Sequence, residues 1–316
     1  MPLLPEIAAF LDEVQTSGVL PAERYPDVAS AREAVAERRR RRMIDLAPIG
    51  GYEDTVVLSE TDVPVRIYRP RGAGPHPIVV WIHGGGWTLD GIEGTHPEAA
   101  RVCQESDAIV ISVGYRLAPE HPYPAALDDC VAVAAWAEEH AAALGGDGSL
   151  GIGGVSSGGN LAAAVALLAA RAGRPRFACQ VLVVPCLDAG FESESWNRNG
   201  TGYLLTRQTC EWFIANYLDD PRLAGDWRVS PLRASTFDGV APAFILTAEY
   251  DPLRDDGFRY AERLRQAGVS VHHTDVEGVI HGFLGQIGPI APSEKAFADI
   301  GSAFRRHLRH DVGSHA

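Results

Sequence analysis

The fold of this chain follows from one pentapeptide, Gly154-Val155-Ser156-Ser157-Gly158. It closes the apolar run 149–155, which predicts a strand, and opens the alanine- and leucine-rich run 157–171, which predicts a helix. A serine in the pattern G-x-S-x-G at such a turn stands in a strained elbow that holds its hydroxyl clear of the sheet. Glycine lies two residues before and two residues after Ser156, whereas Val155 lies two residues before Ser157. We therefore interpret Ser156 as a candidate nucleophile.

Further apolar runs predict seven more strands, at 55–59, 64–69, 78–82, 108–113, 180–185, 243–247 and 270–276. Several of these runs are continuously apolar, which is typical of strands buried on both faces of a parallel sheet. Helical patterns follow from the third strand onward, at 95–105, 125–144, 157–171, 254–268 and 292–309. This alternation predicts an α/β fold with a mostly parallel eight-stranded sheet flanked by helices.

Three segments fall outside the alternation. Residues 3–15 and 27–45 have the pattern of amphipathic helices, and residues 190–225 form an insertion without a predicted strand. The insertion carries several aromatic residues, among them Trp196, Tyr203, Trp212 and Phe213. A long, aromatic and partly helical insertion is more typical of a lid than of a plain connection.

The second helical segment contains five consecutive arginines, Arg38–Arg42. Glu33 and Glu37 accompany them, and Glu37 and Arg41 have the i,i+4 spacing of a helical ion pair. The 316-residue chain has a formal net charge of −13. We therefore interpret the arginines as a solvated helix face and expect neither nucleic acid nor an anionic membrane as a partner.

Composition indicates the compartment. The chain is 46% hydrophobic and 22% charged, as in ordinary globular proteins with a large core. Its five cysteines form no C-x-x-C pair, which favours free thiols in a reducing compartment. Residues 1–14 lack the basic start of a signal peptide, and no apolar run approaches the roughly 20 residues that span a bilayer. These features predict a cytoplasmic protein.

A second glycine-rich segment, His83-Gly84-Gly85-Gly86-Trp87, directly follows the strand predicted at 78–82. Consecutive glycines let backbone N–H groups approach a ligand closely, as the stabilisation of an oxyanion requires. The glycines near the elbow do not form a dinucleotide fingerprint, because Ser156 stands where the third glycine of G-x-G-x-x-G would be. The pattern favours nucleophilic catalysis over nucleotide binding.

A base and an orienting carboxylate should follow the serine in the order Ser, Asp or Glu, His. His281 lies just beyond the last predicted strand, where a base can reach the elbow, and it is our candidate base. Asp251 follows the strand predicted at 243–247 and is the preferred carboxylate, with Glu249 as the alternative. Asp251 is also predicted to be a helix N-cap, with Pro252 at the first helical position. Asp255 and Asp256 fit the first turn of that helix.

Together these segments resemble the hormone-sensitive-lipase-like branch of the α/β-hydrolases, which contains many bacterial carboxylesterases. The resemblance covers nearly the whole chain from about residue 50 onward. It rests on residues 83–87, Tyr115-Arg116-Leu117-Ala118-Pro119-Glu120-His121-Pro122-Tyr123-Pro124-Ala125-Ala126, the elbow with Gly159-Asn160-Leu161-Ala162, Asp251-Pro252-Leu253-Arg254-Asp255 and His281-Gly282-Phe283.

The resemblance implies an α/β-hydrolase fold with a helical cap, formed by residues 1–45 and 190–225, over a catalytic core of residues 46–189 and 226–316. It implies a catalytic triad of Ser156, Asp251 and His281. It also implies an oxyanion hole made by the N–H groups of Gly85, Gly86 and Ser157. The family usually has an acidic residue where this chain has Val155, and we expect this difference to affect rate and substrate preference but not the mechanism.

The expected function is that of a serine carboxylesterase, which hydrolyses short- to medium-chain acyl esters through an acyl-enzyme intermediate and needs no metal or cofactor. The expected partner is a small-molecule ester. The sequence leaves the oligomeric state open, a homodimer included. An amidase or peptidase would use the same triad, so ester and amide substrates both remain open. Plant gibberellin receptors resemble the same family but lack the catalytic histidine, and the presence of His281 favours an enzyme over a receptor.

Overall fold

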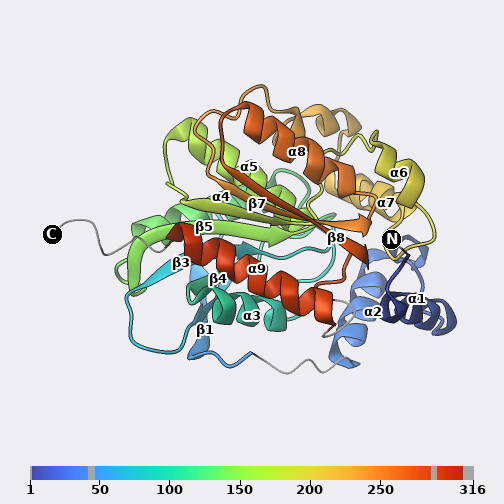
Figure 1. Cartoon of the computed structure of the whole chain (residues 1–316), viewed down its shortest axis with the longest axis horizontal. Helices are drawn as coiled ribbons and strands as arrows, with labels where there is room; N and C mark the ends of the chain where they lie inside the picture. Colours follow the sequence, from blue (N-terminus) through green and yellow to red (C-terminus); the bar gives the residue numbers. More distant parts are fainter. Residues whose placement is uncertain (1, 42–46, 286–289, 309–316) are drawn as a thin grey trace.

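A central sheet with helices on both faces forms the body of the molecule (Figure 1). The computed structural model describes residues 2–41, 47–285 and 290–308. The strands are β1 (Gly51–Val57), β2 (Val63–Arg69), β3 (His76–Ile82), β4 (Ile109–Val113), β5 (Gly146–Val155), β6 (Cys179–Val183), β7 (Ala243–Tyr250) and β8 (Val271–Ile280). The α-helices are α1 (Pro5–Thr16), α2 (Val28–Arg41), α3 (His96–Ser106), α4 (Ala125–Glu139), α5 (Ser157–Ala172), α6 (Glu194–Asn199), α7 (Arg207–Tyr217), α8 (Arg254–Gln266) and α9 (Ala291–Leu308). Short 3-10 helices are η1 (Ala22–Arg24), η2 (Pro221–Gly225) and η3 (Pro231–Arg233).

The strand order is β1-β2-β4-β3-β5-β6-β7-β8. The β1–β2 and β2–β4 pairs are antiparallel, and every other neighbouring pair is parallel. The prediction of a mostly parallel eight-stranded α/β sheet is therefore confirmed. The last strand extends to Ile280, beyond the predicted end at residue 276, because Glu277 and Gly278 interrupt the strand pattern in the sequence before the buried Val279 and Ile280.

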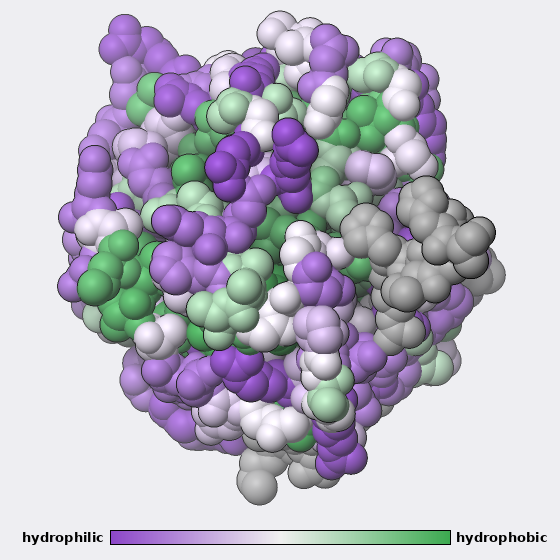
Figure 2. Space-filling view, turned by 90° about the vertical axis from the view of Figure 1, so that its left-hand side faces the viewer, coloured by the Kyte–Doolittle hydropathy of each residue, from purple (hydrophilic) through white to green (hydrophobic). Residues whose placement is uncertain are grey.

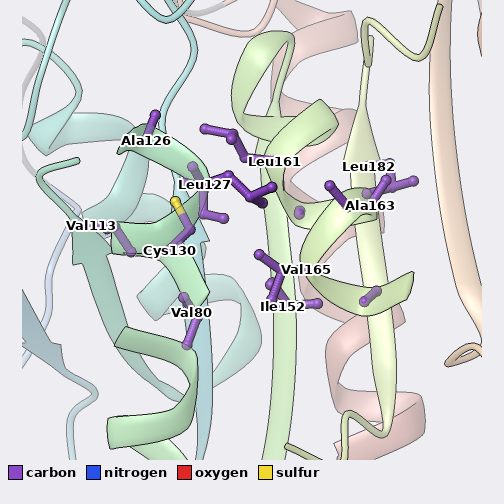
Figure 3. Packing of buried hydrophobic residues seen from close by; sticks show 14 of the residues in the cluster. Val80, Val113, Ala126, Leu127, Cys130, Ile152, Leu161, Ala163, Val165 and Leu182 are labelled. Atoms are coloured by element: carbon purple, nitrogen blue, oxygen red, sulfur yellow. The ribbon is translucent and has the colours of Figure 1, made fainter. Parts of the chain in front are cut away.

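Helices α4, α5 and α8 cover one face of the sheet, and α3 and α9 cover the other. Figure 3 shows side chains of α4 and α5 packed against the apolar residues of the central strands. Helix α5 carries mainly small buried residues, which bring it close to the sheet. On the opposite face, the indole of Trp81 packs edge-on against Phe304 of α9 and donates a hydrogen bond from Nε1 to Glu98 Oε1 at 2.9 Å.

Hydrophilic side chains dominate the face of the molecule that Figure 2 presents, and hydrophobic ones appear between them in small groups. Among the helices of the described ranges, none combines the length and the apolar character that crossing a bilayer requires. The predicted segment 27–45 corresponds to α2, and residues 42–45 of that segment lie outside the described residues.

A buried carboxyl group lies at the start of α8. Asp256 Oδ2 accepts hydrogen bonds from the backbone N–H groups of Leu187 and Asp188, both at 3.1 Å. Burial raises the pKa of Asp256 to about 8, and the nearby negative charge of Asp188 contributes, although these hydrogen bonds oppose the shift. Asp256 lies in the first turn as predicted, but a carboxyl group that stays protonated at neutral pH does not stabilise the helix dipole.

We expect this carboxyl group to make stability fall as pH rises. An aspartate in the unfolded chain loses its proton near about pH 4, whereas folded Asp256 keeps its proton up to about pH 8. Between these values the folded state binds the extra proton, so the free energy of unfolding decreases with increasing pH. The variant Asp256→Asn should flatten that slope in urea titrations at successive pH values. The exposed control Asp219→Asn should not, and equal slopes in the parent and Asp256→Asn would contradict this assignment.

Candidate active site

The turn between β5 and α5 holds Ser156 in a strained conformation. Its φ of 57° and ψ of −118° are disfavoured for a residue with a Cβ. The surroundings fix this conformation, because Ser156 N–H donates to Val183 O at 2.8 Å. A Cβ at Gly154 or Gly158 would collide with the carbonyl oxygen of Ile82, so close backbone packing requires glycine at both positions.

Three predicted residues come together at the ends of parallel strands. Nε2 of His281 lies 3.0 Å from Ser156 Oγ, and Nδ1 lies 2.7 Å from Asp251 Oδ2. Asp251 is fully buried, and His281 is 7% exposed. In the tautomer that donates from Nδ1 to the carboxylate, Nε2 is free to accept the serine proton. The arrangement can therefore deliver a serine alkoxide to an electrophilic carbon.

The carboxylate of Asp251 is held by the backbone. Asp251 Oδ1 accepts a hydrogen bond from Leu253 N–H at 2.8 Å, while Oδ2 faces His281. The prediction that Asp251 caps α8 is wrong: the helix begins at Arg254 with Leu253 as its N-cap. Residues 252–253 instead form a turn, which leaves the carboxylate free to orient the imidazole.

The alternative carboxylate, Glu249, points elsewhere. Its Oε2 accepts from Gly278 N–H at 2.7 Å and so ties the end of β7 to β8. Asn199 of α6 donates to the backbone oxygens of Glu249 and Asp251, at 3.0 and 3.1 Å. Sequence reasoning missed this contribution of Asn199, because no local pattern links α6 to the acid loop.

The glycine loop after β3 lies against the elbow. A Cβ at Gly84 would lie 3.4 Å from Ser156 Cβ. Gly85 and Gly86 have positive φ values of 107° and 60°, and the ring of Phe213 leaves no room for a Cβ at Gly86. Within the described part of the chain, no hydrogen bond occupies the N–H groups of Gly85, Gly86 or Ser157. These donors therefore remain available beside the serine.

Residues near the glycine loop keep it in place. The buried ring of His83 stacks on Tyr115 at 4.2 Å, and burial lowers the pKa of His83, which keeps the ring neutral. Tyr115 OH donates to His83 O at 3.0 Å, and Ala118 N–H donates to Trp87 O at 2.9 Å. In the sequence, residues 115–126 were recognisable only as a family motif. In the structure, Tyr115 and Ala118 of this motif hold the glycine loop in place through hydrogen bonds.

A cavity of about 540 Å³ opens beside Ser156 and His281. Helices α1, α2 and α7 supply much of its wall, and Val155, at the position where the family usually has an acidic residue, lines it as well. Of the four aromatic residues named above in the insertion 190–225, Tyr203 and Phe213 line the cavity. Trp196 instead packs against Phe191, and Trp212 packs against Phe213.

The consecutive arginines of α2 lie in two different environments. Arg40 and Arg41 are exposed and pair with Glu33 and Glu37, as predicted for a solvated face. Arg38 and Arg39 line the cavity, so the interpretation as a purely solvated face is wrong for these two. A helix turns by about 100° per residue, and neighbouring positions therefore face different surroundings.

The chain is similar over most of its length to known ester hydrolases. A family model described as "alpha/beta hydrolase fold" matches residues 79–285. "Carboxylic ester hydrolase LipN" of Mycobacterium tuberculosis is 42% identical over 255 residues, which cover 78% of this chain and 68% of that protein. "Ethyl acetate hydrolase" of Pseudomonas putida is 34% identical over 98% of this chain and 100% of that protein. The structure of a thermostable esterase from Pseudomonas putida ECU1011 superposes with a TM-score of 0.94 at 32% identity, over 98% of this chain and 99% of that chain.

We expect a fluorophosphonate probe to label the protein once, at Ser156. Because Ser156 Oγ is the hydroxyl within hydrogen-bonding distance of His281, Ser156→Ala should abolish labelling. The neighbouring variant Ser157→Ala is the matched control and should still be labelled, since the role expected of residue 157 uses its backbone N–H, which the substitution keeps. Intact-mass spectrometry would measure the adduct. An adduct that persists in Ser156→Ala, or that maps to Ser157, would overturn the assignment.

We expect neutralising Asp251 to be far more harmful than neutralising Glu249. Asp251→Asn should lower kcat by about 10⁴-fold, because the amide no longer holds the imidazole in the required tautomer. Glu249→Gln keeps an oxygen that can accept from Gly278 N–H and should have a small effect. Steady-state kinetics on one activated ester would compare them. The reverse order of effects would show that Glu249 is the orienting carboxylate.

Proposed function

The chain belongs to the hormone-sensitive-lipase-like branch of the α/β-hydrolases, and from this premise we propose that it hydrolyses short- to medium-chain acyl esters through an acyl-enzyme intermediate. It is a carboxylic ester hydrolase, as are the relatives with which it shares most of its length. The observation that carries the proposed mechanism is the continuous hydrogen-bonded chain from Ser156 through His281 to Asp251.

In the first step, Ser156 Oγ attacks the carbonyl carbon of the ester while its proton passes to His281 Nε2. Asp251 stabilises the imidazolium that forms. The tetrahedral intermediate then collapses, the C–O bond to the alcohol breaks, and His281 returns the proton to the leaving oxygen. A water molecule attacks the acyl-enzyme by the same route and releases the acid and the free serine.

The negative charge on the carbonyl oxygen needs fixed donors during both steps. We assign this role to the backbone N–H groups of Gly85, Gly86 and Ser157, whose placement beside the nucleophile supports it. Donors that are already in position need no reorganisation as the charge develops, and removing a single such donor typically costs about 10²–10³ in kcat. Glycines held in a fixed position therefore stabilise the oxyanion better than a flexible loop would.

Residues 1–45 and 190–225 are proposed to act as a cap over the core formed by the rest of the chain. Helices α1, α2, α6 and α7 gather on one side of the molecule in Figure 1. Thr209 Oγ1 of α7 donates to Glu23 Oε2 of η1 at 2.9 Å, which joins the two parts of this cap. Between cap and core lies the cavity that reaches Ser156, and its volume is typical of small-ligand sites.

The walled cavity supports a preference for short and medium acyl chains. A chain inside it is shielded from water by apolar side chains of the cap, such as Leu11, Val14 and Phe213. Once the cavity is full, a longer acyl chain gains no further binding free energy from burial unless the cap moves. The similarity to a hydrolase named for ethyl acetate also supports small ester substrates.

We also propose that the protein works in the cytoplasm. All five cysteines are buried free thiols. Burial raises the pKa of Cys179 to about 12, which suppresses its reactive thiolate form. Thiols that form no disulfide are typical of proteins in reducing compartments.

A series of p-nitrophenyl esters from acetate to palmitate tests the proposed substrate range. The kcat/KM should rise over the first few carbons, since each buried methylene contributes about 0.8 kcal/mol, and should then level off or fall. Matching p-nitroanilides would test amide hydrolysis, and emulsified triolein is the long-chain control. A maximum at twelve carbons or more, or a jump in rate above the solubility limit of the ester, would identify a true lipase and contradict the proposal.

A further inference from the structure

Hydrogen bonds hold the carbonyl groups of the first two glycines of the glycine loop, but not the third glycine. Gly84 O lies 2.7 Å from His83 Nδ1. Gly85 O accepts a hydrogen bond from Leu89 N–H at 2.8 Å. Within the described part of the chain, neither the N–H nor the C=O of Gly86 takes part in a hydrogen bond. Because glycine has the widest choice of backbone conformations, the orientation of Gly86 needs another restraint.

The ring of Phe213, on helix α7, supplies such a restraint. Its carbon atoms lie where a Cβ of residue 86 would stand, so the ring packs directly on the backbone of Gly86. One helical turn further along α7, Tyr217 stacks on Trp87, with the ring centroids 4.5 Å apart and the ring planes 4° from parallel. Residues four positions apart lie on the same face of a helix. One face of α7 therefore contacts two consecutive residues of the glycine loop.

Helix α7 is itself held at both ends. At its start, Thr206 accepts a hydrogen bond from Thr209 N–H at 3.1 Å, and Thr209 Oγ1 donates to Glu23 Oε2 at 2.9 Å. At its end, Tyr217 is fully buried, and its carbonyl oxygen accepts from Tyr123 N–H at 2.8 Å. Because α7 is anchored in this way, a ring that it carries can restrain the loop beside it.

We propose that Phe213 is a positioning residue, which holds Gly86 so that its N–H stays directed at the developing oxyanion. The inference rests on the proposed function, because it gives Phe213 a task at the oxyanion hole proposed there. Phe213 has no donor of its own and acts through Gly86. Without the ring, the backbone at residue 86 gains conformations in which the N–H points elsewhere. A donor that must first reorganise stabilises the negative charge less well than one already in place.

The same ring also lines the cavity beside Ser156, and this second role of Phe213 has to be separated from the first. The two roles predict different kinetics. A change in the cavity wall alters KM, and the effect grows with the length of the acyl chain, because each buried methylene contributes to binding. A loss of oxyanion positioning lowers kcat, and it does so by the same factor for every acyl chain.

The variant Phe213→Ala tests the proposal with p-nitrophenyl acetate, butyrate and hexanoate. We expect kcat to fall about tenfold to a hundredfold with all three esters. The loss should stay below the ~10²–10³ that removal of an oxyanion donor typically costs, because Gly86 remains in the loop. Phe213→Leu should recover part of kcat, since a leucine side chain still packs beside Gly86.

The variant Trp212→Ala is the matched control. It removes a large ring from the neighbouring position of α7, and Trp212 is not among the described residues that line the cavity. It should leave kcat nearly unchanged. For each variant, the active enzyme is counted by complete reaction with the fluorophosphonate probe, so that unfolded protein does not enter kcat.

An inhibitor pair adds a readout that a merely structural role would not move. A trifluoromethyl ketone with a butyl chain forms a hemiketal with Ser156, and the negative oxygen of the adduct mimics the oxyanion of the transition state. The corresponding alcohol binds without an adduct. In Phe213→Ala, the Ki of the ketone should rise by about the factor by which kcat/KM falls, and the Ki of the alcohol should stay nearly constant.

The outcomes separate this inference from the proposed function. An unchanged kcat on the acetate in Phe213→Ala, an unchanged Ki of the ketone, or an equal loss in Trp212→Ala would overturn the positioning role and leave the esterase intact. An effect confined to KM that grows with chain length would show that Phe213 only lines the cavity. Failure of the parent protein to hydrolyse any of these esters would contradict the proposed function itself.

Discussion

The site depends on the close backbone contact where the elbow meets β3. Gly154 and Gly158 lie so near the carbonyl oxygen of Ile82 that neither position has room for a Cβ. This contact draws α5, β5 and the start of the glycine loop together, and it forces Ser156 into a conformation that the rest of the fold must stabilise. The proposed nucleophile and the proposed oxyanion donors therefore share one support, which is held together by main-chain packing.

The side chains of Asp251 and His281 are held by hydrogen bonds within the described part of the chain. Each oxygen of Asp251 has one partner, and each nitrogen of His281 has one. A buried carboxylate without partners would cost several kcal/mol, and the turn at residues 252–253 supplies one partner for Asp251 through Leu253 N–H. Tyr115 supports the glycine loop in a similar way, because its hydroxyl donates a hydrogen bond to His83 O.

Helix α2 is fastened to the same loop by arginines. Arg32 donates to the backbone oxygens of Thr88 and Ala118, both at 2.8 Å, and also pairs with Glu120. Arg39 pairs with Asp90, which follows Leu89 just beyond the glycine loop. The wall of the cavity is thus anchored to the segment that carries the proposed oxyanion donors. Residues of α2 and Ser156 line the same cavity, although the two regions are far apart in the chain.

The sequence alone determined the order of strands and helices, the identity of the elbow and the place of His281, because these depend on local periodicity and on glycines that only tight turns require. It favoured Asp251 and kept Glu249 as an alternative, and it gave α8 the wrong N-cap, since both depend on which backbone N–H a carboxylate meets after folding. No local pattern in the sequence indicated the contacts of Asn199 with the loop that carries Asp251. Nor did any local pattern indicate that Arg38 and Arg39 line the cavity while Arg40 and Arg41 are exposed. Only tertiary structure decided them, because contacts between segments far apart in the chain determine which side chains leave water and which charges become neighbours.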